Sequence, residues 1–130
     1  DWVVAALLHD IGDIYAPCNH SEYAAAIIRP YVREQCTWVV KTHGAFQMYY
    51  YGAHVGSDPN AREAFRGNPY FDDCAEFCEQ WDQNSFDPDY AAKPLEFFAP
   101  MVREVFARPA FDPAVIRSGV RVALSGGARP

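Results

Sequence analysis

Several features that would place this chain in a familiar class are missing from its 130 residues. No apolar run approaches the roughly 20 residues that a membrane span needs, and no signal peptide is visible. No cluster of Lys and Arg resembles a surface that binds a phosphate backbone, and the net charge is -6. We therefore expect neither a membrane nor a nucleic acid as a partner.

Cysteine is scarce, and its spacing excludes the common thiolate metal motifs. The four residues form no CxxC pair; they are Cys18, Cys36, Cys74 and Cys78. The last two are one helical turn apart, where both can face a core. A disulfide framework is not expected, and we interpret the thiols as reduced in a cytoplasmic protein.

The residues that are present predict a single packed helical domain. Half of the chain is hydrophobic and 15% is aromatic, which argues against disorder. No segment alternates apolar and polar residues over a strand's length, so we expect an all-α bundle. Gly12 and Gly44 are expected to end helices. The expected helices cover residues 1–11, 20–29, 34–43, 46–54, 59–66, 68–82 and 94–108, with a short one from 113. We expect residues 109–130 to form a C-terminal tail that is partly disordered and frays at 125–127.

The most informative feature is His9-Asp10, which closes the apolar run of residues 2–8. An imidazole and a carboxylate at the end of a buried helix are costly unless something pairs with them, and a divalent metal suits both. His20, His43 and Asp82 follow at helix ends or junctions. Nitrogen and oxygen ligands without sulfur favour Fe, Mn, Zn or Co. Five ligands exceed what one catalytic zinc uses, which favours two metals.

Each of these residues also has a simpler interpretation. A lone histidine such as His20 or His43 is more often hydrogen bonded or solvent-facing than a ligand, and Asp82 alone would more often cap a helix. Asp13 could equally cap the loop that it opens. We expect His54 either to support a ligand without touching the metal or to lie on the surface. The joint pattern, rather than any one residue, therefore predicts the metal site.

Four stretches resemble the HD-domain superfamily, which is all-α and metal-dependent. The motif VAALLHDIGD at residues 4–13 resembles its core motif, and NHSEYAA at 19–25 resembles the second helix of two-metal members. THG at 42–44 resembles the segment of the next ligand. WDQNSFD at 81–87 resembles the terminal aspartate segment of the mixed-valent diiron oxygenases, the group of myo-inositol oxygenase and the organophosphonate oxygenases. The resemblance covers roughly residues 2–108.

This resemblance implies an HD-like helical domain over residues 1–108 that holds two iron ions in a mixed-valent pair, with Mn or Zn as other possibilities. It implies five ligands: His9, Asp10, His20, His43 and Asp82, with Asp10 bridging. The implied activity is oxidative cleavage, with O2, of a C–C or C–P bond in a small hydroxylated substrate. The family has one more histidine on an earlier helix, and since this chain starts at Asp1 without Met, we expect it to be N-terminally truncated.

Two positions depart from the family pattern and bear on the substrate. Asp13 and Gln47 stand where relatives tend to carry a basic residue and a lysine, and we expect both to contact substrate as catalytic-site residues. Neither would hold a phosphonate dianion well, so a neutral polyol or an amine-bearing cation fits better. Arg29 and Lys41 remain as candidate contacts for an anion.

Two other functions stay open. Most superfamily members are phosphohydrolases, and the same ligands would suit that reaction. The few Lys and Arg residues near the motifs argue against it, as does the lack of the Gly-Tyr-Pro signature of members that act on cyclic dinucleotides. A non-catalytic fragment is the third possibility, because one family ligand is missing.

Overall fold

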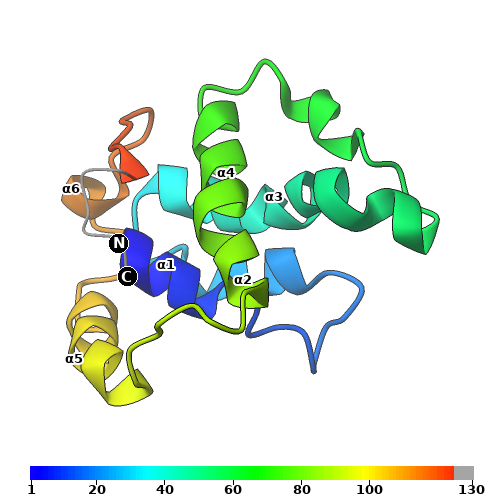
Figure 1. Ribbon diagram of the computed structural model, residues 1–130. Coiled ribbons are helices and arrows are strands. Elements are labelled where there is room, and N and C mark those ends of the chain that lie inside the picture. The colour runs from blue at the N-terminus through cyan, green and yellow to red at the C-terminus, as the bar shows by residue number, and fades with distance from the viewer. Residues whose placement is uncertain (125–130) are drawn as a thin grey trace.

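A computed structural model describes residues 1–124 and shows an all-α protein, as expected from the sequence (Figure 1). No strand occurs within this described part of the chain. The α-helices are α1 (Trp2–Leu8), α2 (His20–Ile28), α3 (Glu34–Tyr51), α4 (Phe71–Phe77), α5 (Leu95–Phe106) and α6 (Pro113–Ile116). Short 3-10 and π segments join them: η1 (Gly52–Val55), η2 (Ala61–Phe65), η3 (Cys78–Asp82) and η4 (Gln83–Phe86).

The first helix is shorter than expected and ends at Leu8. The chain then runs through successive turns, closed by bonds from the Ile11 amide to the Leu8 carbonyl and from the Asp13 amide to the Asp10 carbonyl, both 3.1 Å. Gly12 lies in these turns against the start of α2, where a Cβ would come within 3.0 Å of the His20 backbone. The glycine therefore lets the loop rest directly on α2.

The expected break at Gly44 is wrong, because α3 continues through it from Glu34 to Tyr51. A glycine inside a helix costs only about 1 kcal/mol relative to alanine, which a packed helix can bear. Gly44 faces α2, where a Cβ would lie 2.8 Å from the Ser21 hydroxyl oxygen. It marks a close helix–helix contact, not a helix end. The last part of the expected 46–54 helix is instead η1.

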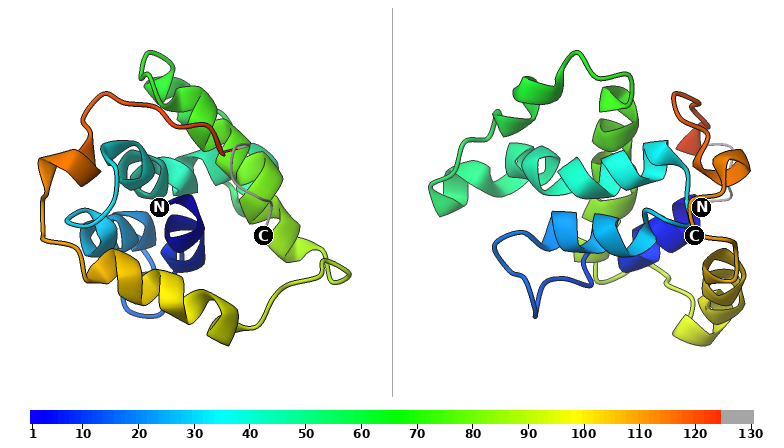
Figure 2. Two further views of the ribbon diagram at one scale, coloured as in Figure 1. Left: turned by 90° about the vertical axis from the view of Figure 1, so that its left-hand side faces the viewer. Right: turned by 180° about the vertical axis from the view of Figure 1, so that it is seen from behind.

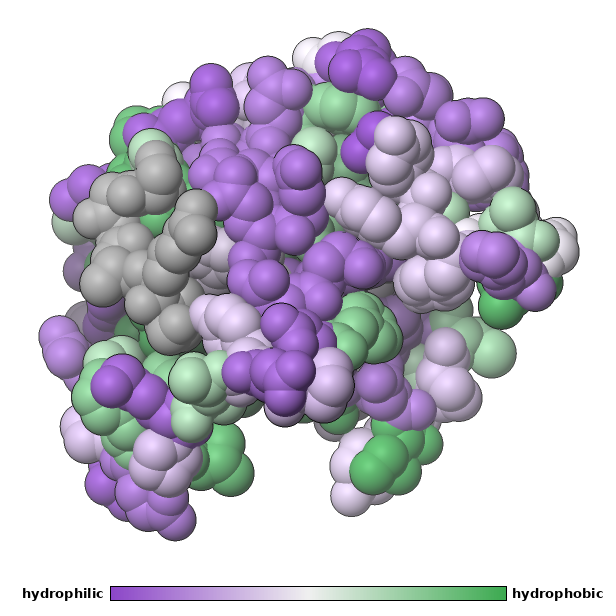
Figure 3. All heavy atoms as spheres, viewed as in Figure 1, coloured by the Kyte–Doolittle hydropathy of each residue, from purple (hydrophilic) through white to green (hydrophobic). Residues whose placement is uncertain are grey.

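The helix expected at 68–82 is present but changes geometry along its length. It begins as α4, becomes the π segment η3 at Cys78 and continues as η4, where a loop was expected. The outward face over α4 is hydrophilic (Figure 3), since Asp72, Glu79 and Gln80 are exposed. π segments are rare and recur at functional sites. Here the π segment ends on Asp82, one of the predicted ligands.

The core lies between α1, α2, α3 and α4. Its largest fully buried apolar side chains are Phe46, Phe77 and Ile28. Cys74 and Cys78 are also buried, as their spacing predicted. Among residues 1–124, no helix combines the length and apolar character that crossing a bilayer requires.

The chain after α6 returns past the N-terminal helices (Figure 2). The Trp2 indole N–H donates to the Val122 carbonyl at 3.1 Å, and the Gln35 amide exchanges two bonds with the Val122 backbone. Leu124 is fully buried. The segment up to residue 124 is thus held to the helices at Val122 and Leu124. The domain boundary after residue 108 stays a prediction. The fraying expected at 125–127 lies outside the described residues.

Candidate metal centre

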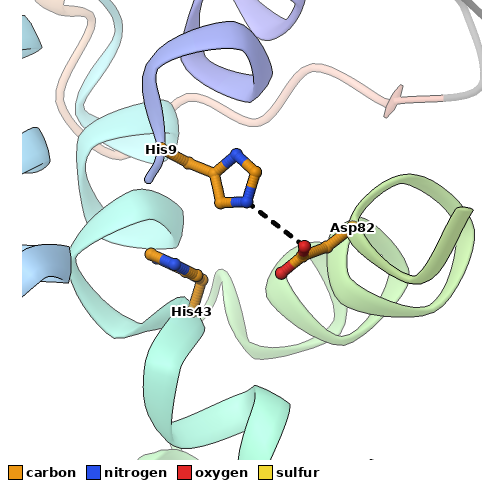
Figure 4. Close-up of side chains that lie close together, drawn as sticks. All are labelled: His9, His43 and Asp82. Carbon is orange, nitrogen blue, oxygen red and sulfur yellow. Dashed lines mark ion pairs between the residues drawn. The ribbon is translucent and has the colours of Figure 1, made fainter. Parts of the chain in front are cut away.

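The five predicted ligands come together at one point in the fold, from four separate stretches of chain. His9 and Asp10 lie in the turn that ends α1, and His20 is the first residue of α2. His43 lies in the middle of α3, and Asp82 ends η3. Figure 4 shows His9, His43 and Asp82 pointing toward one another from three elements. Asp10 and His20 complete the cluster beside His43.

Three ligand atoms form one compact triangle on the side of α2. The Nε2 atoms of His20 and His43 are 3.2 Å apart, and Asp10 Oδ1 lies 3.3 Å and 3.1 Å from them. The His43 side chain is 1% exposed and the Asp10 side chain is 47% exposed, so the triangle reaches from the interior to the surface. All three atoms face a common centre.

A second group forms around His9 on the other side of Asp10. His9 Nε2 lies 3.1 Å from Asp10 Oδ2 and 3.2 Å from Asp82 Oδ1. His9, His43 and Asp82 also present ligand atoms that all lie within 4.8 Å of one another. The two oxygens of Asp10 therefore face two different sets of histidines, which is the arrangement of a bridging carboxylate.

The backbone sets which nitrogen of two imidazoles is free. The Nδ1 atoms of His9 and His43 each lie 2.6 Å from a carbonyl oxygen three residues earlier, at Ala6 and Val40. A carbonyl oxygen can only accept, so in both neutral rings Nδ1 carries the proton. Both Nε2 atoms then keep their lone pairs, which is the form that binds metals.

His9 Nε2 is a buried polar atom without a hydrogen-bond partner, despite the two carboxylates near it. Burial works against a charged imidazole here, but the carboxylates of Asp10 and Asp82, which a protonated Nε2 would face, outweigh it and raise the pKa of His9 to about 10. Burial would likewise raise the pKa of Asp10, yet His43 and His9 hold it far below its usual range. The centre of the cluster thus attracts positive charge, which a proton or a metal ion can supply.

The spacing and chemistry of these atoms fit a metal ion. Nitrogen and oxygen donors about 2.1 Å from a metal lie about 3.0–3.4 Å from each other in octahedral or tetrahedral sites. The observed separations of 3.1–3.3 Å match this. Hydrogen bonding with the Cys74 thiol and burial raise the pKa of Cys78, so its sulfur stays protonated. The donors are therefore nitrogen and oxygen only.

Gln47 contacts a ligand in the structure. Its Nε2 donates to Asp82 Oδ2, and its Oε1 accepts from Gln83 Nε2 at 2.6 Å. Gln47 is only 4% exposed. The glutamine pair therefore orients Asp82 and leaves Oδ1 turned toward His9. Contact between Gln47 and a substrate stays a prediction.

Asp13 lies at the rim of the cluster, with its side chain 61% exposed and Oδ1 3.9 Å from His20 Nδ1. A cleft of about 450 Å³ opens here onto the ligands. Tyr51 and Phe86 also line it, and no role was expected for Phe86 from the sequence. Burial raises the pKa of Tyr51, and Asp82 and Asp10 add to the effect, so the phenol stays neutral.

The spacing of residues on α3 indicates that Tyr51 belongs to the site. His43, Gln47 and Tyr51 follow one another at intervals of four and all line the cleft. Such residues share one helix face, but the expected break at Gly44 hid the pattern. Gln83 carried no comparable signal beyond its place next to Asp82.

The remaining predicted residues lie elsewhere. His54 is exposed in η1 and is not among the cleft residues. Arg29 and Lys41 line a separate cavity, so they do not supply the cleft with positive charge. Within residues 1–124, the cleft lining contains no Lys or Arg.

No protein-family model, curated protein or solved structure matches this chain. The interpretation of the site therefore depends on the residues and their geometry.

Proposed function

We propose that this protein is an HD-like two-metal enzyme, and that it is an oxygenase of the diiron type. The observation that carries the proposal is the position of Asp10, whose Oδ1 faces His20 and His43 while Oδ2 faces His9. In the proposed centre Asp10 would be a ligand to both ions. His20 and His43 would hold one ion, and His9 with Asp82 the other.

The lining of the cleft argues for an oxygenase over a phosphohydrolase. Besides metal ions, phosphoryl groups are usually held by Arg or Lys. The described lining has neither, and besides its histidines it offers carboxylates, an amide and a phenol. Two iron ions held here would supply O2 chemistry, with cleavage of a C–C or C–P bond as the reaction class. The protein contributes orientation and exclusion of water.

The residues around the ions have distinct roles in this proposal. Asp13 would accept a hydrogen bond from a substrate hydroxyl or ammonium group at the rim, and the neutral Tyr51 phenol would donate one. Phe86 presents an apolar surface to the same cleft. Gln47 keeps Asp82 in place. C–C cleavage in a neutral polyol or an amine-bearing substrate suits this set better than C–P cleavage of a phosphonate, because it places no dianion near three carboxylates.

The test begins with the metal. The chain is expressed with iron, and bound metal is quantified beside an EPR measurement of the partly oxidised sample. Two iron ions per chain with the signal of a coupled Fe(II)/Fe(III) pair would support the proposal. Zinc or manganese with hydrolysis of p-nitrophenyl phosphate, and no such signal, would identify a phosphohydrolase instead.

A further inference from the structure

A second cavity, of about 340 Å³, lies on the side of α3 away from the metal cluster. The end of α2 and the first half of α3 line it on one side, and Phe111 and Ile116 of the segment around α6 line it on the other. The Phe111 amide donates to the Pro30 carbonyl at 2.7 Å, which holds this segment across the two helices. Trp38, Phe111 and Ile116 make the walls mainly apolar. Its volume is at the lower end for small-molecule sites.

One polar atom in this cavity has no partner within the described residues. Thr37 lines the cavity and is only 7% exposed, yet its hydroxyl makes no hydrogen bond. A buried hydroxyl without a partner is destabilising. Its oxygen is closed to water in this structure, so the side chain would have to rotate about χ1 for a bound ligand to satisfy it.

The charged residues that line the cavity indicate which charge that ligand would carry. Arg29 and Lys41 line the cavity, and neither forms an ion pair in the part of the chain that the structure describes. Glu34 is the third charged residue, and its Oε2 already accepts from the Tyr70 hydroxyl at 3.0 Å and the Gly119 amide at 2.9 Å. Two cations and one carboxylate leave a net charge of +1.

We propose that this cavity binds a small amphipathic monoanion, namely a carboxylate with an aromatic or branched apolar body. The body would lie against Trp38, the carboxylate would reach Lys41 and Arg29, and the Thr37 hydroxyl would donate to it. The cavity shares no lining residue with the metal cleft. The proposal is therefore independent of the function proposed above.

The test is calorimetric titration of the chain with naphthoate, in the presence of EDTA so that no metal can bind the probe. We expect one site per chain, and binding at least about fivefold weaker for neutral naphthylmethanol. Lys41→Met and Thr37→Val should each weaken naphthoate binding by about the same factor. Arg29→Met provides a second test of the charge.

Lys93→Met is the matched control, because Lys93 is an exposed lysine outside this cavity and should leave the affinity unchanged. Circular dichroism spectra and thermal melts verify that each variant is folded. Absence of naphthoate binding to the unmodified chain would overturn the proposal. Equal binding of the neutral alcohol, or an unchanged affinity in both Lys41→Met and Arg29→Met, would overturn it as well.

Discussion

The imidazoles of His9 and His43 are aimed by the backbone that carries them, since each Nδ1 lies 2.6 Å from a carbonyl three residues earlier. This fixes the ring orientation before any ion binds. It also leaves Nε2 of His9 buried and without a hydrogen-bond partner between two carboxylates. A preformed set of donors lowers the ordering cost of binding, so we expect the cluster to bind metal in the folded chain.

Removing a ligand tests the assignment most simply. His9→Ala or Asp10→Ala should abolish metal binding, because one removes the unpartnered nitrogen and the other the carboxylate that we propose as the bridge. His54→Ala is the matched control, since His54 is exposed in η1. Inductively coupled plasma mass spectrometry of the purified variants gives the metal content. Equal metal loss in His54→Ala would show that the ligand set is misassigned.

Gln47 should affect metal affinity because it holds the Asp82 carboxylate in place. Gln47→Leu leaves Asp82 Oδ2 and Gln83 Nε2 without their bonds, and loss of such support typically lowers metal affinity about 10- to 100-fold. Competition with a fluorescent chelator measures this. Gln80→Leu, at an exposed position of η3, should bind metal as the unmodified chain does. An unchanged affinity in Gln47→Leu would show that Asp82 needs no support.

Protons and metal ions compete for His9, whose pKa of about 10 lies above the ordinary 6.5. In the metal-free chain, the stability that the proton on His9 contributes to the fold is therefore complete below about pH 6.5 and is lost as pH rises through about 10. A metal must displace the proton, so its affinity rises with pH over the same window. Thermal melts with Mn(II) and with EDTA, at about pH 6 and about pH 8, should show the larger metal-induced rise in Tm at the higher pH. A rise in Tm that shrinks as pH increases would contradict this.

Helix α3 acts as the main positioning element of the site. It presents His43, Gln47 and Tyr51 to the cleft at intervals of four, while Gly44 lets α2 approach with His20. The sequence predicted α2 nearly residue for residue, because Asn19, the alanine run and Pro30 mark it clearly. It could not predict that Gly44 continues a helix, since only the contact with Ser21 explains that glycine. The π geometry before Asp82 had no sequence signal either.

The loop between α1 and α2 should be sensitive to a single methyl group. Gly12→Ala would place a Cβ 3.0 Å from the His20 Cα and carbonyl oxygen, which are backbone atoms and cannot rotate away. We expect a loss of about 1–3 kcal/mol in the free energy of unfolding, together with weaker metal binding as His20 is displaced. Urea denaturation measures the first and chelator competition the second.

Gly67→Ala is the control for this substitution, because nothing lies within 4 Å of the Cβ that it would add. Its stability should stay within about 0.5 kcal/mol of the unmodified chain. Equal stability of Gly12→Ala and Gly67→Ala would mean that the loop does not rest on α2.

Both end regions of the described chain are bonded to residues that lie far away in the sequence. Asp1 accepts a hydrogen bond from Arg108 at 2.9 Å, and Asp73 on α4 binds Arg121 through two bonds of 2.7 and 2.9 Å. The sequence predicted an all-α fold from the lack of strand-like alternation. It predicted the convergence of the five candidate ligands from the His-Asp motif and the histidines and aspartate that follow it. It could not predict these ties, since residues far apart in sequence form them.

The tie at Asp73 should contribute measurably to stability. Its side chain is 5% exposed, and in Arg121→Ala only Gln35 would still bind its carboxylate. Arg121 itself is half exposed, so water weakens the pair, and we expect a small but measurable loss in the free energy of unfolding. Arg103→Ala, at an exposed position of α5, is the control. Indistinguishable urea transitions for the two variants would mean that the C-terminal segment adds no stability.

The central claim is that Asp10 bridges two metal ions. Anomalous diffraction from crystals grown with saturating Mn(II) tests it most directly, because it locates each ion without assuming an activity. We predict two peaks about 3.5–4 Å apart, one beside His20 and His43 and the other beside His9 and Asp82. A single peak, or none at these residues, would contradict the account.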